Sequence, residues 1–298
     1  MQHRVHRFVS NDLTLRAAAV NATDVVKEMQ KLQTLRPLPT VAVGRAVVGS
    51  LLMASQLKDG QQVGLYFRSS GPIGAIYAEA HFDGRVRGYT PHALYEPANY
   101  DTLSLKDAVG KDGVLTVTRH QPFQKQPFTG SVEMVSGEIG DDIANYLQKS
   151  QQIRSLVSLG VYLDSFGQVR AAGGLLIEVM PGVEDDIVDR VQKNAEKMST
   201  GVSKLLLDGA NPIELVKPYL DGIPFTELDH DYPISYSCPC DKDRVMQALE
   251  IMGIAELEDM VSKDEAAEVT CQMCGRPYEI PVDDLREIKN RLFRNSLN

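Results

Sequence analysis

Four cysteines, in two close pairs near one end of the chain, constrain the fold of this sequence most. The chain has 298 residues and only these four cysteines, which form the motifs Cys238-Pro-Cys240 and Cys271-Gln-Met-Cys274. In structural sites Zn²⁺ prefers four soft ligands at the corners of a tetrahedron, and two close pairs brought together by the intervening residues can supply them. We therefore expect these four cysteines to hold one zinc ion.

The residues around the cysteines, 233–298, are expected to form a small domain of their own. The second pair lies in a segment whose pattern predicts strand, knuckle, strand, with Gly275 at the tight turn. Asp241 and Asp283 are expected to cap two helices. Units below about 70 to 80 residues rarely hold themselves together by an apolar core alone. A bound metal ion is expected to cross-link and stabilise the unit, and its removal is predicted to unfold the unit.

Residues 1–180 are expected to form a larger domain with mostly antiparallel β-sheets and helices. Short alternating segments joined by turn signals, such as Asp83-Gly84, predict hairpins, and Asp141 is expected to cap a short helix. This mixture favours an α+β fold. A search for a phosphate-binding loop, a dinucleotide fingerprint, a zinc-protease motif and a nucleophile elbow finds none of them. We therefore expect no catalytic residues and no enzyme activity.

Residues 181–232 are expected to form a helical linker. Acidic residues outnumber basic ones there, and the residues after Pro181-Gly182 have the apolar spacing of an amphipathic helix. Asn211-Pro212-Ile213-Glu214 is typical of a helix start. One interpretation is a pair of ordinary helices docked on the first domain. The other is a segment whose docking is marginal, because few large apolar residues hold it. The residues of this segment alone favour the first.

The charge and hydropathy of the chain exclude several classes of partner. The formal net charge of −9 opposes binding to nucleic acid and to anionic lipid. No stretch approaches the ~18 uninterrupted apolar residues of a membrane span. The first residues do not continue into the apolar region of a secretory signal. We expect a cytoplasmic protein that binds neither nucleic acid nor a membrane.

Three roles for the cysteines remain open at this point. A plain zinc ribbon, acting as a constitutive protein-interaction module, is favoured by spacing alone. A thiol oxidoreductase could use Cys271 and Cys274, although no thioredoxin-like setting surrounds them. A redox switch is the third role, since zinc keeps cysteines as thiolates, the form that oxidants attack. The C-x-C pair is less usual in ribbons, and a disulfide between residues two apart is strained and easily reduced.

These motifs, together with segments of the first domain, resemble a known family, the redox-regulated heat shock protein of 33 kDa, a bacterial holdase chaperone. The resemblance spans nearly the whole chain, and the combination of C-x-C, C-x-x-C and the upstream domain is what makes it specific. It is carried by CPCDKDRV at 238–245, CQMCG at 271–275, GPIGAIYAEA at 71–80, VSGEIGDDIANYL at 135–147 and AAGGLLIEVMPG at 171–182.

The resemblance implies a chaperone that works without ATP and is inactive while reduced and zinc-bound. It implies that oxidation forms the disulfides Cys238–Cys240 and Cys271–Cys274 and releases the zinc ion. The linker, residues 181–232, would then unfold, and apolar surface would capture unfolding client proteins. The resemblance also implies that the active form is a homodimer.

Overall fold

Two β-sheets form the framework of the first of the two units into which the chain divides, Met1–Ser237 and Cys238–Asn298. The computed structural model describes residues 3–100, 104–229 and 232–296. The mostly antiparallel α+β fold expected from the sequence is confirmed. The three-part division at residues 181 and 233 stays a prediction about how the chain folds and unfolds.

The first sheet has five strands, all paired antiparallel, in the order β10-β1-β2-β9-β8. Its strands are β1 (Val5–Ser10), β2 (Leu15–Asn21), β8 (Ser155–Leu163), β9 (Val169–Val179) and β10 (Phe225–Leu228). Strand β9 lies between β2 and β8 and is buried along most of its length. A Cβ on Gly173 would meet the Leu206 side chain at 2.5 Å, and one on Gly174 would meet Val48 at 3.0 Å. These glycines let layers on both faces of the sheet approach closely.

The second sheet has six strands, in the order β11-β5-β4-β3-β6-β7, and its pairs are antiparallel except β11 with β5. Its strands are β3 (Gln62–Ser69), β4 (Ala75–His81), β5 (Arg85–Tyr89), β6 (Gly113–His120), β7 (Phe128–Glu133) and β11 (Ser235–Tyr236). The predicted hairpin at Asp83-Gly84 joins β4 to β5, and Gly84 has φ 83°, a conformation that glycine adopts without strain.

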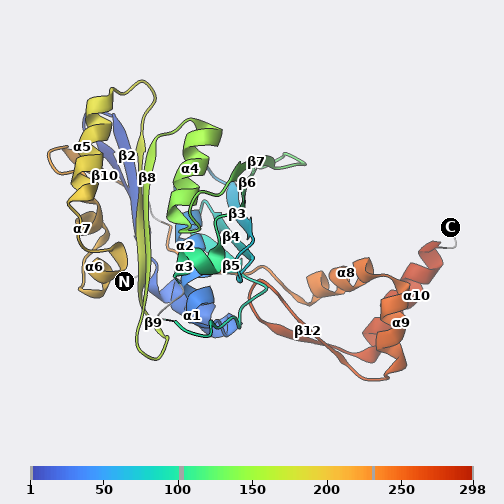
Figure 1. Cartoon of the computed structure of the whole chain (residues 1–298). Coiled ribbons are helices and arrows are strands. Elements are labelled where there is room, and N and C mark those ends of the chain that lie inside the picture. Colours follow the sequence, from blue (N-terminus) through green and yellow to red (C-terminus); the bar gives the residue numbers. More distant parts are fainter. Residues whose placement is uncertain (1–2, 101–103, 230–231, 297–298) are drawn as a thin grey trace. The chain divides into compact units, whose positions relative to one another are not determined.

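Helix α2 (Pro37–Ala54) lies between the two sheets and contacts strands of both (Figure 1). Among the residues that the structure describes, it is the one helix with the length and apolar composition of a membrane span. Most of that helix is buried inside the fold, because its apolar residues surround the axis and pack on two sheets at once. Three further helices flank this layer: α1 (Thr23–Gln33), α3 (Leu105–Val109) and α4 (Gly140–Gln151).

The expected linker helices cover the other face of the five-stranded sheet (Figure 1). They are α5 (Asp185–Glu196), α6 (Val202–Leu207) and α7 (Pro212–Val216). Their apolar residues pack with those of the sheet into one group, which we call the linker-covered cluster. Its buried members are Phe8, Leu15, Ala17, Ala19, Ala171, Leu175, Ile177 and Val179 on the sheet, and Val191, Val202, Leu206, Leu215, Val216, Tyr219, Leu220 and Ile223 in the linker segment.

The linker segment also contributes strand β10, which the helical interpretation missed. This strand pairs with β1, from Arg7 opposite Leu228 to Ser10 opposite Phe225. The Phe225 ring packs edge-on against Phe8, with 5.7 Å between ring centroids. The linker segment is therefore docked by strand pairing as well as by helix packing.

Helix starts show which local signals were decisive. Asn211 caps α7 as predicted, since its side chain accepts a hydrogen bond from the Glu214 amide and the Glu214 carboxylate accepts one from the Asn211 amide. The cap predicted at Asp141 is wrong, because α4 already begins at Gly140. The buried Asp142 carboxylate instead accepts amide hydrogen bonds from residues 135–137 and so fixes the preceding loop.

The second unit consists of three helices and one β-hairpin. Helix α8 (Lys242–Met252) is capped by Asp241 as predicted, because its carboxylate accepts a hydrogen bond from the Arg244 amide. The cap predicted at Asp283 is wrong, since that residue already lies in the first turn of its helix. The remaining elements are α9 (Ile254–Ser262), β12 (Ala267–Thr270), β13 (Pro277–Ile280) and α10 (Val282–Ser296).

Candidate metal centre

The first cysteine pair lies in the loop that precedes α8. Cys238 and Cys240 flank Pro239, which fixes one backbone angle of the short loop. Asp241 follows at once as the cap of α8, so the start of this helix fixes where the loop ends. The capped helix thus holds the backbone next to Cys240 in a defined conformation.

The second pair lies in the turn between β12 and β13, the predicted knuckle. The Cys271 amide donates a hydrogen bond to the Arg276 carbonyl at 2.9 Å, and the Gly275 amide donates one to the Cys271 carbonyl at 2.8 Å. Gly275 has φ 70°, as the tight turn predicted at this glycine requires. The antiparallel pairing of β12 with β13 closes the hairpin and presents both sulfurs on one turn.

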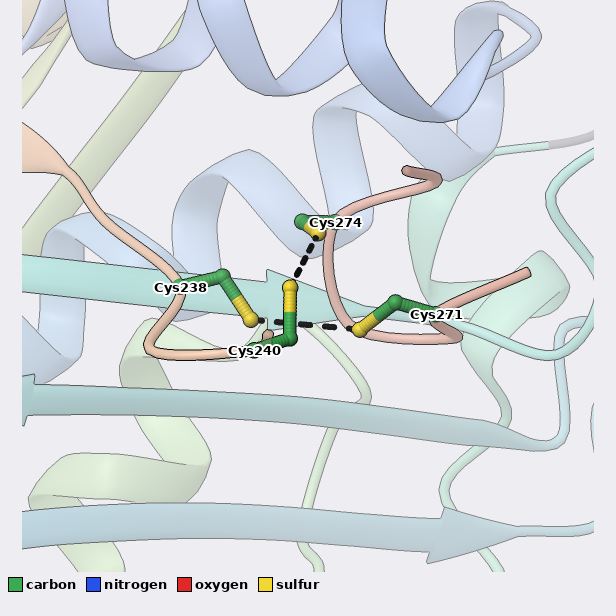
Figure 2. A group of neighbouring side chains, drawn as sticks. All are labelled: Cys238, Cys240, Cys271 and Cys274. Carbon is green, nitrogen blue, oxygen red and sulfur yellow. Dashed lines mark hydrogen bonds between the residues drawn. The ribbon is translucent and has the colours of Figure 1, made fainter. Parts of the chain in front are cut away.

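The four sulfurs of the two pairs converge on one point (Figure 2). All lie within 4.8 Å of one another. Two contacts run between the pairs: 3.3 Å from Cys240 Sγ to Cys274 Sγ, and 3.9 Å from Cys238 Sγ to Cys271 Sγ. No disulfide bond joins any of these four described residues. The structure thus brings all four predicted ligands together.

The dimensions of the cluster suit a zinc ion. With Zn–S distances of about 2.3 Å, a regular tetrahedron places its sulfurs about 3.8 Å apart. The two sulfur–sulfur contacts between the pairs, 3.3 and 3.9 Å, lie on either side of this value. Four cysteine sulfurs also form a soft donor set, which suits zinc and not magnesium or calcium. The arrangement is compatible with a zinc site closed by four protein ligands.

A tyrosine side chain touches the cluster. Tyr278, on β13, donates hydrogen bonds from its hydroxyl to the Cys240 carbonyl oxygen at 2.9 Å and to Cys240 Sγ at 3.1 Å. The sequence analysis missed this residue. A tyrosine in the strand that follows a C-x-x-C knuckle was the available signal, because such a strand runs back past the ligands.

Hydrogen bonding and burial separate the acidities of two thiols. Burial disfavours the thiolate of Cys240, but hydrogen bonds from Tyr278 and from the neighbouring thiols outweigh this and lower its pKa to about 7. At Cys274, burial raises the pKa of the thiol. A cation among these sulfurs would stabilise all four thiolates, since coordination to a metal deprotonates a thiol.

A small apolar core supports the metal centre from one side. Its buried members come from all three helices and from β13: Val245, Leu249, Leu257, Ile280, Leu285 and Ile288. Met252, the last residue of α8, is 48% exposed.

Comparisons with known proteins agree with this architecture. The family model described as Hsp33 protein matches residues 3–281. The 33 kDa chaperonin of Latilactobacillus sakei is 35% identical over 291 residues, covering 97% of this chain and 99% of the relative. That of Synechococcus elongatus is 39% identical over 280 residues, covering 92% and 93%.

A solved structure matches the fold over almost its full length. The crystal structure of the 33 kDa chaperonin, a heat shock protein 33 homologue, from Thermotoga maritima superposes with a TM-score of 0.87. The two sequences are 29% identical, and the match covers 98% of this chain and 99% of the other. With the family model spanning both units, these findings show that the chain belongs to the Hsp33 family, which is a family of chaperones and not of enzymes.

Proposed function

We propose that this chain is a redox-regulated holdase chaperone that works without ATP. In the reduced state the four cysteines hold one zinc ion and the chaperone is inactive. Oxidation converts them to two disulfides, the linker segment unfolds, and a client-binding surface is exposed. The observation that carries the proposal is the pairing of a four-sulfur cluster with a linker segment that covers a large apolar sheet face.

The covered sheet face is the proposed client surface. Its side chains on β1, β2 and β9 include Phe8, Leu15 and Leu175, each at most 1% exposed. Undocking residues 181–232 would expose this apolar area to water, which is unfavourable by roughly 25 cal/mol per Å². Binding the apolar segments of an unfolding protein would cover it again. Large exposed apolar patches are typical of protein-interaction sites.

The sensing chemistry belongs to the thiolates. Hydrogen peroxide transfers one oxygen to a thiolate and gives a sulfenic acid and water once protons are supplied. The neighbouring cysteine sulfur then attacks the sulfenic sulfur, and a second water leaves as the disulfide forms. Each disulfide thus consumes two thiols and one peroxide and yields two waters. The proposed products are Cys238–Cys240 and Cys271–Cys274, each closed by the nearest cysteine along the chain.

Loss of the thiolates would remove the bonds that hold the second unit together. Bound zinc would supply Lewis-acid cross-linking of the two pairs and, in comparable modules, folding energy of about 10–16 kcal/mol. A disulfide sulfur is a poor ligand by comparison, so a cluster with both pairs oxidised loses its donors. Because only Ser237 separates β11 from Cys238, a disordered second unit would leave the strand that follows the linker segment attached to a mobile chain.

We further propose that the active form is a homodimer, that it acts in the cytoplasm, and that its partners are unfolded or partly folded proteins. The net charge of −9 argues against a nucleic-acid partner. The most apolar helix, α2, already packs on strands of both sheets, which supports a chain that functions without a membrane.

The test measures aggregation of a heat-denaturing client by light scattering, with reduced and peroxide-treated protein. We expect the reduced protein to suppress scattering poorly and the oxidised protein to suppress it well. Zinc and thiol counts on the same samples should fall from one zinc and four thiols to none. Equal, poor suppression by both forms would refute the proposal. Equal, good suppression with zinc retained would instead favour a constitutive interaction module.

A further inference from the structure

The hydroxyl of Tyr278 links the two cysteine pairs of the cluster through hydrogen bonds. Tyr278 stands on β13, in the hairpin that carries Cys271 and Cys274. Its hydroxyl reaches across to Cys240, in the loop before α8, and lies 2.9 Å from the carbonyl oxygen and 3.1 Å from Sγ. The ring is half-buried, so the contact is part of the packed unit.

The hydroxyl has one hydrogen and two acceptors within reach. A neutral thiol sulfur is a weak acceptor, so the carbonyl oxygen competes well for the hydrogen when Cys240 is protonated or in a disulfide. A thiolate carries a negative charge, and hydrogen bonds to charged acceptors are roughly twice as strong as neutral ones. In the reduced cluster the hydrogen is therefore drawn towards the sulfur.

A hydrogen bond to a thiolate withdraws electron density from it. The sulfur remains a metal ligand but becomes a poorer nucleophile, and groups that hydrogen-bond to metal ligands typically change metal affinity by about 10- to 100-fold. We propose that Tyr278 is a positioning residue of the metal centre, which keeps Cys240 in the cluster and lowers the reactivity of its sulfur towards oxidants and alkylating agents. The inference rests on the proposed zinc site and deepens the proposed switch.

The test compares Tyr278→Phe with the wild-type protein, both reduced and loaded with zinc. Each cysteine is followed by alkylation with iodoacetamide and site-resolved mass spectrometry. We expect the alkylation rate of Cys240 relative to Cys274 to rise about tenfold or more, as loss of one charge-assisted hydrogen bond implies. Zinc release under limiting peroxide, followed with a chromogenic chelator, should accelerate in the same range.

The ratio of two rates separates positioning from general loosening of the fold. A looser fold exposes all four sulfurs and raises all four rates together, whereas loss of this bond acts on Cys240 first. Tyr162→Phe removes a hydroxyl from the 40% exposed tyrosine of β8 and should change neither ratio nor zinc release. An unchanged ratio in Tyr278→Phe, or an equal rise at all four cysteines, would overturn the inference.

A second variant decides the question should Tyr278→Phe fail to hold zinc. Site-specific incorporation of 3-fluorotyrosine at position 278 keeps the ring and makes the hydroxyl a stronger donor. We expect Cys240 to be alkylated more slowly than in the wild type, and an unchanged or faster rate would contradict the inference. None of these readouts involves a client protein, so failure of the holdase proposal in light scattering and failure of this inference are distinguishable.

Discussion

The linker segment and the second unit are held in place by different means. The linker segment contributes eight buried side chains to the linker-covered cluster and pairs one strand with β1. The second unit has a core of six buried apolar residues and gathers four cysteines beside it. One region is held chiefly by burial and strand pairing, and the other by a small core that suits a metal cross-link.

This difference decides what each region can respond to. Apolar burial responds to temperature and to mutation, and an oxidant leaves it unchanged. Sulfur ligation can be removed by a specific reaction at neutral pH, because the same thiolates that bind the metal are the ones oxidants attack. We therefore expect sensitivity to oxidants in the second unit and sensitivity to heat in the linker segment.

The largest expected effect is unfolding of the second unit while the first unit stays folded. Cys274→Ser changes a buried cysteine of the proposed zinc site, and we expect the second unit to lose the zinc contribution to folding, about 10–16 kcal/mol in comparable modules, while the sheets of the first unit stay folded. Hydrogen exchange, resolved by peptide, measures the folding of each unit. Thr270→Ser, an exposed neighbour, is the control. Full protection of residues 238–296 from hydrogen exchange in zinc-free Cys274→Ser would contradict the expectation that a metal cross-link holds the second unit folded.

A weaker linker segment should activate the protein without an oxidant. Leu215 is fully buried in the linker-covered cluster, and Leu215→Ala should cost about 2–5 kcal/mol of docking. We expect faster hydrogen exchange in α5 to α7 and partial suppression of client aggregation by the reduced, zinc-bound protein. Ile213→Ala in the same helix is the matched control, because Ile213 is 39% exposed. Equal behaviour of the two variants would show that docking does not depend on this cluster.

As the pH falls, the second unit should unfold before the first. Burial opposes ionisation of Glu79, but hydrogen bonds from His81 and Tyr77 and the charge of Arg87 outweigh it and lower its pKa from 4.5 to about 2. Its contribution to the stability of the first unit, on the order of 2 kcal/mol, is therefore complete above pH 4.5 and lost as the pH falls towards 2. The proposed zinc site should already weaken at a pH above 4.5 during acidification, because protons compete with the metal for the thiolates.

The check on this order is acid unfolding followed separately in each unit by hydrogen exchange. Glu79→Gln should lower the free energy of unfolding of the first unit at neutral pH and flatten its decline below pH 4.5. The second unit should show the same acid transition in Glu79→Gln as in the wild type. If the first unit of the wild-type protein unfolded before the second as the pH falls, the expected order of stability to acid would be wrong.

The smallest effect concerns one helix start in the linker segment. Asn211→Ala removes the side-chain cap of α7 and should cost about 1 kcal/mol, because the Glu214 amide in the first turn loses its acceptor. Asn211→Asp keeps an oxygen at the same place and should be nearly neutral. Midpoints of thermal unfolding of the reduced protein measure both changes. A loss in Asn211→Asp as large as in Asn211→Ala would show that the cap itself is unimportant.

The candidate site was predictable because donor identity and spacing carry most of its chemistry. Cys238 and Cys240, and Cys271 and Cys274, are close along the chain, so only the approach of the two pairs had to be supplied by the fold. The sequence could not show which sulfurs lie nearest, since the 3.3 Å contact joins Cys240 to Cys274, 34 positions apart. Tyr278 was missed for the same reason: its contact with Cys240 depends on tertiary structure.

The fold was predictable where a local signal is also the tertiary signal. The Asn211 cap, the turn at Gly84 and the alternation in β4 and β5 have local causes, and the structure confirms them. Pairing between distant segments has no such local cause. Strand β1 has the sequence VHRFVS, which lacks regular alternation, and its partner β10 lies more than 200 residues away in a segment that is otherwise helical. Both strands were therefore missed.

The pairing of β10 with β1 has a consequence for the breadth of clients. If β10 leaves with the rest of the linker segment, β1 becomes the border of its sheet, and a row of backbone amides and carbonyls is left without partners. Backbone groups are the same in every polypeptide, so an extended stretch of almost any protein can satisfy them. The vacated border would recognise the main chain as such and leave selectivity to the neighbouring apolar side chains.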